Sequence, residues 1–143
     1  MDDLDAVMER YHETLVTITN GDAGPQKALW SNREDVTLAN PWGPAVVGWG
    51  QAATRLDAAA SHFANGHAVG FERLAKHVSG DLACFVEVEQ FETRIDRGPL
   101  VPVSLRVTTI FRREEGAWKV IHRHADPITT PRTGESLTQS PRA

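Results

Sequence analysis

The sequence predicts an α+β fold in which helices near the N-terminus pack on a strongly curved, mainly antiparallel sheet. Two observations support this prediction. Helical spacing of apolar residues is confined to the part of the chain before Asn65-Gly66, and four long runs with strand character follow it, separated by tight turns. With its helices gathered on one face, such a sheet forms a conical α+β barrel.

The first helix has the clearest signal. Its apolar residues recur at alternating spacings of three and four, which places them on one face: Leu4, Val7, Met8, Tyr11, Leu15 and Ile18. Asp2 or Asp3 caps its start, and Asn20-Gly21 ends it. A short second helix is expected over 22–30 and an alanine-rich third helix over 51–63.

The strands follow from alternation and from turn residues. Two short strands, 35–39 and 45–47, flank a turn that contains Pro41-Trp42-Gly43-Pro44. The long strands are expected over 67–78, 81–94, 101–113 and 117–126. Residues 1–127 therefore form a single domain, and the Thr-, Ser- and Pro-containing segment 128–143 is expected to be a mostly disordered tail.

Composition limits the classes of partner. The chain has 143 residues and a net charge of −4, which argues against nucleic acid as a partner. No apolar run approaches the roughly 20 residues of a membrane span, and the acidic start lacks the features of a secretory signal, so a cytoplasmic protein is expected. The single cysteine, Cys84, excludes an intrachain disulfide and a multi-cysteine zinc site.

Three motifs, in this order, resemble the nuclear transport factor 2-like superfamily. They are Asp35-Val36-Thr37 with Val46-Val47-Gly48, then Gly80-Asp81-Leu82-Ala83, then the hairpin from Arg106 to Asp126. Within the superfamily the chain is most similar to polyketide-cyclase (SnoaL)-like and ketosteroid isomerase-like proteins. Its C-terminal hairpin also resembles the association domain of calcium/calmodulin-dependent kinases. The resemblance implies a conical pocket between helices and sheet, and a homodimer formed through the outer sheet face.

Glu89 is the candidate catalytic acid. Strand alternation places Glu87 and Glu89 on the same face as Phe85 and Phe91. The resemblance to the kinase association domain implies that Glu89 faces the pocket, where a carboxylate would act as a general base. The alternative is that both glutamates lie on the solvent or dimer face and pair with Arg106 or Arg94.

His122 and His124 are the other catalytic candidates. Uninterrupted alternation over 117–126 places both on the face of Trp118 and Val120, and so towards the core. Ile121, which falls on the opposite face, leaves that orientation open. His12 and His77 are expected at the surface. No third ligand is evident beside the histidine pair, so no metal site is expected.

Four residues are candidates for substrate binding. Thr109 shares an apolar face with Leu105, Val107 and Phe111, which favours an inward position and leaves Arg106 outside. Tyr11 is the single tyrosine and lies on the first helix, where the isomerase-like pattern has one. Trp42 and Trp49 flank the short strands near the expected pocket mouth. For Tyr11, Trp42 and Trp49 the alternative is a role in core packing.

These features predict a cofactor-free isomerase, cyclase or hydrolase that uses general acid–base catalysis on a small lipophilic substrate. No phosphate-binding glycine loop or nucleophile elbow is present, so no cofactor is expected. Asn40-Pro41-Trp42 stands where the isomerase pattern has its base, which argues against steroid-type isomerisation. The alternative is a non-catalytic ligand-binding or dimeric assembly module of the same fold.

Overall fold

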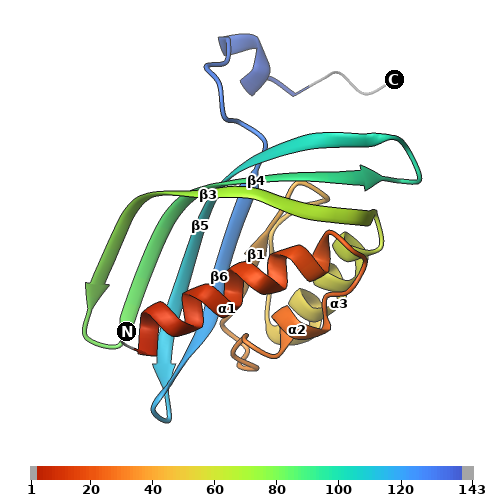
Figure 1. Cartoon of the computed structure of the whole chain (residues 1–143). Helices are drawn as coiled ribbons and strands as arrows, with labels where there is room; N and C mark the ends of the chain where they lie inside the picture. Colours follow the sequence, from red (N-terminus) through yellow and green to blue (C-terminus); the bar gives the residue numbers. More distant parts are fainter. Residues whose placement is uncertain (1–2, 140–143) are drawn as a thin grey trace.

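A computed structural model describes residues 3–139, which form three helices on one side of a curved sheet (Figure 1). The helices are α1 (Asp3–Ile18), α2 (Gly24–Lys27) and α3 (Trp49–Ala60). The strands are β1 (Thr37–Ala39), β2 (Val46–Val47), β3 (Phe63–Ser79), β4 (Leu82–Ile95), β5 (Leu100–Glu114) and β6 (Ala117–Asp126). The predicted conical α+β architecture is confirmed.

The six strands form one sheet in the order β2-β1-β6-β5-β4-β3. Only β1 and β6 pair in parallel; the other neighbours are antiparallel. The pairing of β3 with β4 shifts register at three places, and that of β5 with β6 shifts once. Such irregularities bend and twist a strand, which accounts for the strong curvature of the sheet around α1 and α3 (Figure 1).

The core lies between α1 and the concave face of the sheet. The face of α1 predicted from its spacing is buried from Leu4 to Leu15. On the sheet, Phe85 and Phe111 are completely buried, and their rings meet edge to face at 5.8 Å. Burial of this apolar surface, rather than intrinsic propensity, holds the threonine-rich end of α1 in helical form.

The junction between α3 and β3 differs from the prediction. The helix expected over 51–63 ends at Ala60, and the strand expected from His67 begins at Phe63. Phe63 pairs with Ile95 of β4, and the amide of Asp96 donates a hydrogen bond to the carbonyl of His62. Helical spacing did not reveal this boundary because Phe63 satisfies both patterns, and contacts with β4 decide between them.

A β-bulge in β6 changes the faces of the last strand. Val120 pairs with Phe111 and His122 with Ile110, so Ile121 is the extra residue. Side chains beyond the bulge therefore reverse their order: Arg123 is buried inside the cone, and His122 points outward. The prediction that His122 and His124 share the face of Trp118 and Val120 was wrong because it assumed uninterrupted alternation.

Beyond the sheet, residues 128–139 are exposed and include a 3-10 helix, Gly134–Leu137. The remainder of the expected tail, 140–143, and the expected cap at Asp2 lie outside the described residues. None of the helices within 3–139 has the length and apolar character needed to cross a membrane.

Substitution of Gly66 tests the contact between β3 and Thr19, the residue after α1. A Cβ at Gly66 would lie 2.7 Å from the carbonyl oxygen of Thr19, which also accepts the Gly66 amide hydrogen bond. We expect Gly66→Ala to destabilise the protein by about 1–3 kcal/mol through overpacking. Urea unfolding measures the change.

The matched control is Gly50→Ala in α3, where nothing lies within 4 Å of the new methyl group. Alanine is the better helix former, so this variant should be as stable as the parent or more stable. Equal stability of the two variants would contradict the close contact at Gly66.

Candidate functional site

A cavity of about 560 Å³ opens between the helices and the concave face of the sheet. Its wall is mainly apolar, with side chains from α1, α3, β5 and β6, such as Leu15, Leu56, Val103 and Ala125. The polar members of the wall are Gln26, Asn40, Ser104, Arg123 and Thr129. Arg123 is the only charged side chain among the described residues that form this wall.

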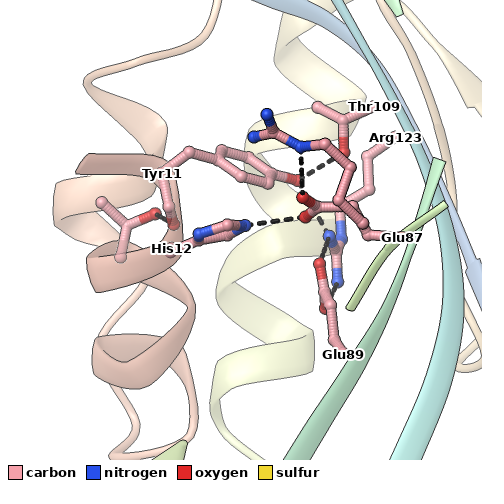
Figure 2. A network of polar contacts seen from close by, with 8 residues as sticks. Tyr11, His12, Glu87, Glu89, Thr109 and Arg123 are labelled. Atoms are coloured by element: carbon pink, nitrogen blue, oxygen red, sulfur yellow. Dashed lines mark hydrogen bonds and ion pairs between the residues drawn. The ribbon is translucent and has the colours of Figure 1, made fainter. Parts of the chain in front are cut away.

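Arg123 reaches the wall from inside the core, where it is held by Glu89. Its side chain is 8% exposed and that of Glu89 is 1% exposed. The guanidinium donates two parallel hydrogen bonds to the carboxylate, Nη1 to Oε2 at 2.9 Å and Nη2 to Oε1 at 2.8 Å (Figure 2). This two-point geometry is the strongest form of a charge-assisted pair and compensates in part for the removal of both charges from water.

Tyr11 and Thr109 support this pair from α1 and β5. Arg123 Nη1 donates to the Tyr11 hydroxyl at 2.8 Å, and Thr109 Oγ1 donates to the same oxygen at 3.4 Å (Figure 2). Burial raises the pKa of Tyr11, although the nearby positive charge of Arg123 opposes the rise. Tyr11 is therefore a neutral phenol that holds the guanidinium in place.

The charged state of Arg123 follows from the same contacts. Burial alone would lower the pKa of Arg123, but Glu89 and Tyr11 outweigh burial and raise it above its ordinary value. The site therefore contains a fixed cation whose charge is balanced by one carboxylate.

The neighbouring carboxylate of β4, Glu87, has other partners. His12 Nε2 lies 2.7 Å from Glu87 Oε1, and Arg73 Nε lies 3.4 Å from Oε2. The His12 ring stacks on Phe71 at 3.9 Å and is partly buried, so the expectation of a surface position for His12 was wrong. Both glutamates face inward, and neither pairs with Arg106 or Arg94 as the alternative interpretation required.

An aromatic stack lies at the edge of the cavity. Trp42, a wall residue, stacks on the His62 ring at 3.8 Å and meets Phe63 edge to face. His62 Nδ1 lies 2.6 Å from Asp96 Oδ1, which fixes the plane of the imidazole. The stack fastens the loop that follows β1 to the start of β3.

The sequence-predicted residues divide into three groups. Trp42 lies on the cavity wall, and Glu89 borders a smaller adjoining hollow of about 50 Å³ that shares Leu15 and Arg123 with the cavity. Tyr11 and Thr109 lie behind Arg123, in the core.

The third group lies away from the cavity. The ring centroids of Trp49 and Trp30 lie 6.2 Å apart, and Trp49 is not part of the cavity wall. His122 Nδ1 lies 2.7 Å from Thr37 Oγ1, and His124 Nε2 lies 3.0 Å from Asp126 Oδ2. Both histidines lie on the outer face because of the β6 bulge.

Arg123 and Gln26 are among the polar wall residues that the sequence did not predict. Uninterrupted alternation would place Arg123 on the outer face with Ile121, and nothing in the local pattern reveals the bulge at Ile121. Gln26 belongs to a four-residue helix, too short for periodicity to assign a face. Within residues 3–139, no group of three or more His, Cys, Asp or Glu side chains is arranged to hold a metal ion.

Comparison with known proteins agrees with this architecture. The family model of the SnoaL-like domain matches residues 4–129. No sequence among curated proteins matches the chain.

Three solved structures share the fold. A candidate dehydratase of the nuclear transport factor 2-like family from Streptomyces avermitilis is 20% identical, with a TM-score of 0.72 and coverage of 90% of this chain and 96% of that one. A nuclear transport factor 2-like superfamily protein from Salmonella enterica is 19% identical, with a TM-score of 0.74 and coverage of 92% and 93%. A candidate ketosteroid isomerase from Parabacteroides distasonis is 16% identical, with a TM-score of 0.60 and coverage of 86% of each chain.

A double-mutant cycle tests how strongly the charges of Glu89 and Arg123 are coupled. Either Glu89→Leu or Arg123→Met leaves one buried charge without its partner, so we expect each single variant to lose about 3–5 kcal/mol of stability. The double variant should lose much less than the sum, because no unpaired charge remains. Urea unfolding of the four proteins measures the coupling.

An exposed pair provides the control. Lys27 Nζ and Asp57 Oδ2 lie 2.8 Å apart at the surface, and Lys27→Met should cost less than about 1 kcal/mol. Additive losses at Glu89 and Arg123 would show that the two charges do not depend on one another.

The lowered pKa of His122 predicts that the stability of the protein depends on pH. Partial burial, and then the charge of His124, lower the pKa of His122 below its ordinary 6.5. The unfolded chain therefore binds the proton more readily than the folded protein, and stability should fall as the pH drops below about 6.5. Melting temperatures between pH 7.5 and 5 should show this slope, and His122→Gln should reduce it; an unchanged slope would contradict the assignment.

Proposed function

Because the chain belongs to the SnoaL-like domain family, within the nuclear transport factor 2-like superfamily, we propose that it binds a small, mainly apolar organic molecule inside its cone. The observation that supports this most directly is the cavity of about 560 Å³, which lies in the usual size range of small-molecule sites. Its wall combines an apolar surface with a few fixed polar groups, the ordinary composition of such sites.

Arg123 gives the proposed site a hydrogen-bond donor. Of its five N–H groups, three make the bonds to Glu89 and Tyr11, and Nε has no partner among the described residues. Within the same residues, Gln26 Nε2 is the only fully buried side-chain nitrogen or oxygen atom without a partner. Arg123 Nε is therefore not fully enclosed, and the open spaces that its side chain borders are the cavity and its adjoining hollow.

The proposal predicts that bicyclic ketones stabilise the protein. A ligand that binds only the folded state raises the melting temperature, by an amount that grows with the logarithm of its concentration relative to its Kd. We expect α-tetralone to raise the melting temperature of the parent protein. Val103→Trp places an indole in the cavity and should abolish the effect.

Val69→Trp is the matched control, because Val69 is exposed on β3 and lies outside the cavity wall. It should respond to α-tetralone as the parent does. A response that Val103→Trp retains in full would place binding elsewhere and overturn the proposal.

A second candidate is acid–base catalysis in the same cavity, as a cofactor-free isomerase, cyclase or hydrolase. The specific observation is that Glu89, a carboxylate, borders the hollow next to Arg123. In this proposal Arg123 binds the oxygen of a ketone while Glu89 removes a proton from the adjacent carbon. The enolate that forms regains the proton from the neutral Glu89 acid, so the protein ends unchanged.

Deuterium exchange tests the catalytic candidate. In heavy water, the parent protein should accelerate exchange at the carbon next to the carbonyl of α-tetralone, followed by NMR. Glu89→Asp keeps the charge beside Arg123 but withdraws the carboxylate, and should slow the catalysed exchange by about a hundredfold. Binding without accelerated exchange would leave the ligand-binding alternative and reject catalysis on this substrate.

The homodimer and the cytoplasmic location stay predictions. The outer sheet face carries half-buried apolar residues, including Val86, Val88 and Ile110, which suits the predicted contact between two copies. This surface is separate from the cavity, so either proposal for the cavity is compatible with it.

A further inference from the structure

The mouth of the cavity lies where three segments meet at one end of the sheet. Because β1 and β6 run parallel, with Ala39 beside His124, the loop after β1 and the segment after β6 leave the sheet together. The start of β5 reaches the same end, since β5 is antiparallel to β6. These three segments supply the exposed members of the cavity wall: Pro41, Pro102, Pro127 and Thr129.

Trp42 lies just inside this mouth. It follows the exposed Pro41 in the loop after β1, is itself half-buried, and contributes to the cavity wall. Pro41 and Pro44 each have a fixed φ and restrict the residue before them, so backbone rotation within the loop is concentrated at Trp42 and Gly43. The indole can therefore change position while both ends of the loop stay in place.

Two contacts from different elements hold this loop. On the side of β3, the Trp42 indole stacks on the His62 ring, with centroids 3.8 Å apart and planes 1° from parallel. Asp96 fixes the histidine twice, because its Oδ1 lies 2.6 Å from His62 Nδ1 and its amide donates to the His62 carbonyl at 2.8 Å. On the side of α3, Arg55 Nη1 donates to the Pro44 carbonyl at 2.7 Å, which holds the far end of the loop.

The stack is the weaker restraint, and it acts on the part of the loop that can rotate. His62 and Asp96 are partly exposed, and an exposed imidazole–carboxylate contact contributes little to stability. A stacked aromatic pair shifts an equilibrium by roughly tenfold. A contact of this strength keeps the indole in place most of the time and still breaks readily.

We propose that Trp42 is a gate at the mouth of the cavity and that His62, oriented by Asp96, is its latch. While the stack holds, the indole narrows the mouth; when the stack breaks, the indole turns away and a small organic molecule enters or leaves. His62 and Asp96 are not wall residues, so they act on a ligand only through Trp42. As a device for ligand entry the inference rests on the proposed binding function, but the opening itself is measurable without a ligand.

Cysteine labelling measures the opening directly. Ala125→Cys places a thiol at a buried position of the wall, and Cys84→Ser removes the native thiol. Iodoacetamide should reach the new thiol only when the mouth opens. We expect His62→Ala to speed the labelling roughly tenfold. Asp96→Gly, at a backbone φ of 50° that suits glycine, should speed it by a smaller factor because the stack remains.

Two controls separate a gate from a general loss of stability. His67→Ala removes an exposed imidazole that lies 3.1 Å from Glu92 on the same pair of strands and outside the wall, so it should leave the labelling rate unchanged. Ala83→Cys places a thiol at a buried position away from the wall, which iodoacetamide reaches through unfolding. His62→Ala should change labelling of this thiol far less than labelling of the Ala125→Cys thiol.

The outcomes separate the gate from the proposed function. An unchanged labelling rate for Ala125→Cys in the His62→Ala protein, or equal acceleration of both buried thiols, would overturn the gate. Stopped-flow binding of α-tetralone gives a second readout: association and release should both speed up roughly tenfold in His62→Ala, with little change in Kd. A weaker Kd with an unchanged association rate would also overturn the gate. Faster labelling in a protein that binds no compound would reject the binding function while the gate stands.

Discussion

The buried ion pair between Arg123 and Glu89 is the interaction around which the inside of the cone is arranged. Two charges removed from water are tolerated only where geometry and further hydrogen bonds compensate for lost hydration. Here the compensation comes from separate elements: β4 supplies Glu89, β6 supplies Arg123, and α1 supplies Tyr11. The pair therefore ties the first helix to the sheet at the level of the cavity.

The inward face of β4 shows how the fold accommodates two acids in an apolar core. Four buried side chains follow one another along this face: Phe85, Glu87, Glu89 and Phe91. Glu87 forms an ion pair with Arg73 and contacts His12. Glu89 pairs with Arg123 in the interior (Figure 2). Adjacent residues of α1, Tyr11 and His12, serve the two clusters, so the helix position is fixed by polar contacts as well as by packing.

The same arrangement gives the cavity its chemical character. Glu89 balances the charge of Arg123, and both of its oxygens are occupied, so the free carboxylate expected from the sequence is absent from the wall as it stands. What Arg123 offers the cavity is donor capacity, set in a mainly apolar surface. A site of this kind favours binding of an oxygen acceptor, and proton transfer by Glu89 requires the carboxylate to exchange one partner for another.

The order of helical and strand patterns along the chain predicts the fold class. Periodicity within single elements predicts the buried face of α1, the inward position of Thr109, and the face that Glu87 and Glu89 share with two phenylalanines. Periodicity left open whether that face of β4 points inward. Which side chains reach the cavity depends on pairing and packing between elements. One extra residue at Ile121 reverses the last strand, bringing Arg123 inside and placing His122 and His124 outside. A bulge depends on pairing with β5 and leaves no local pattern, and the burial of Gln26 against Trp30 depends on contacts that only folding creates.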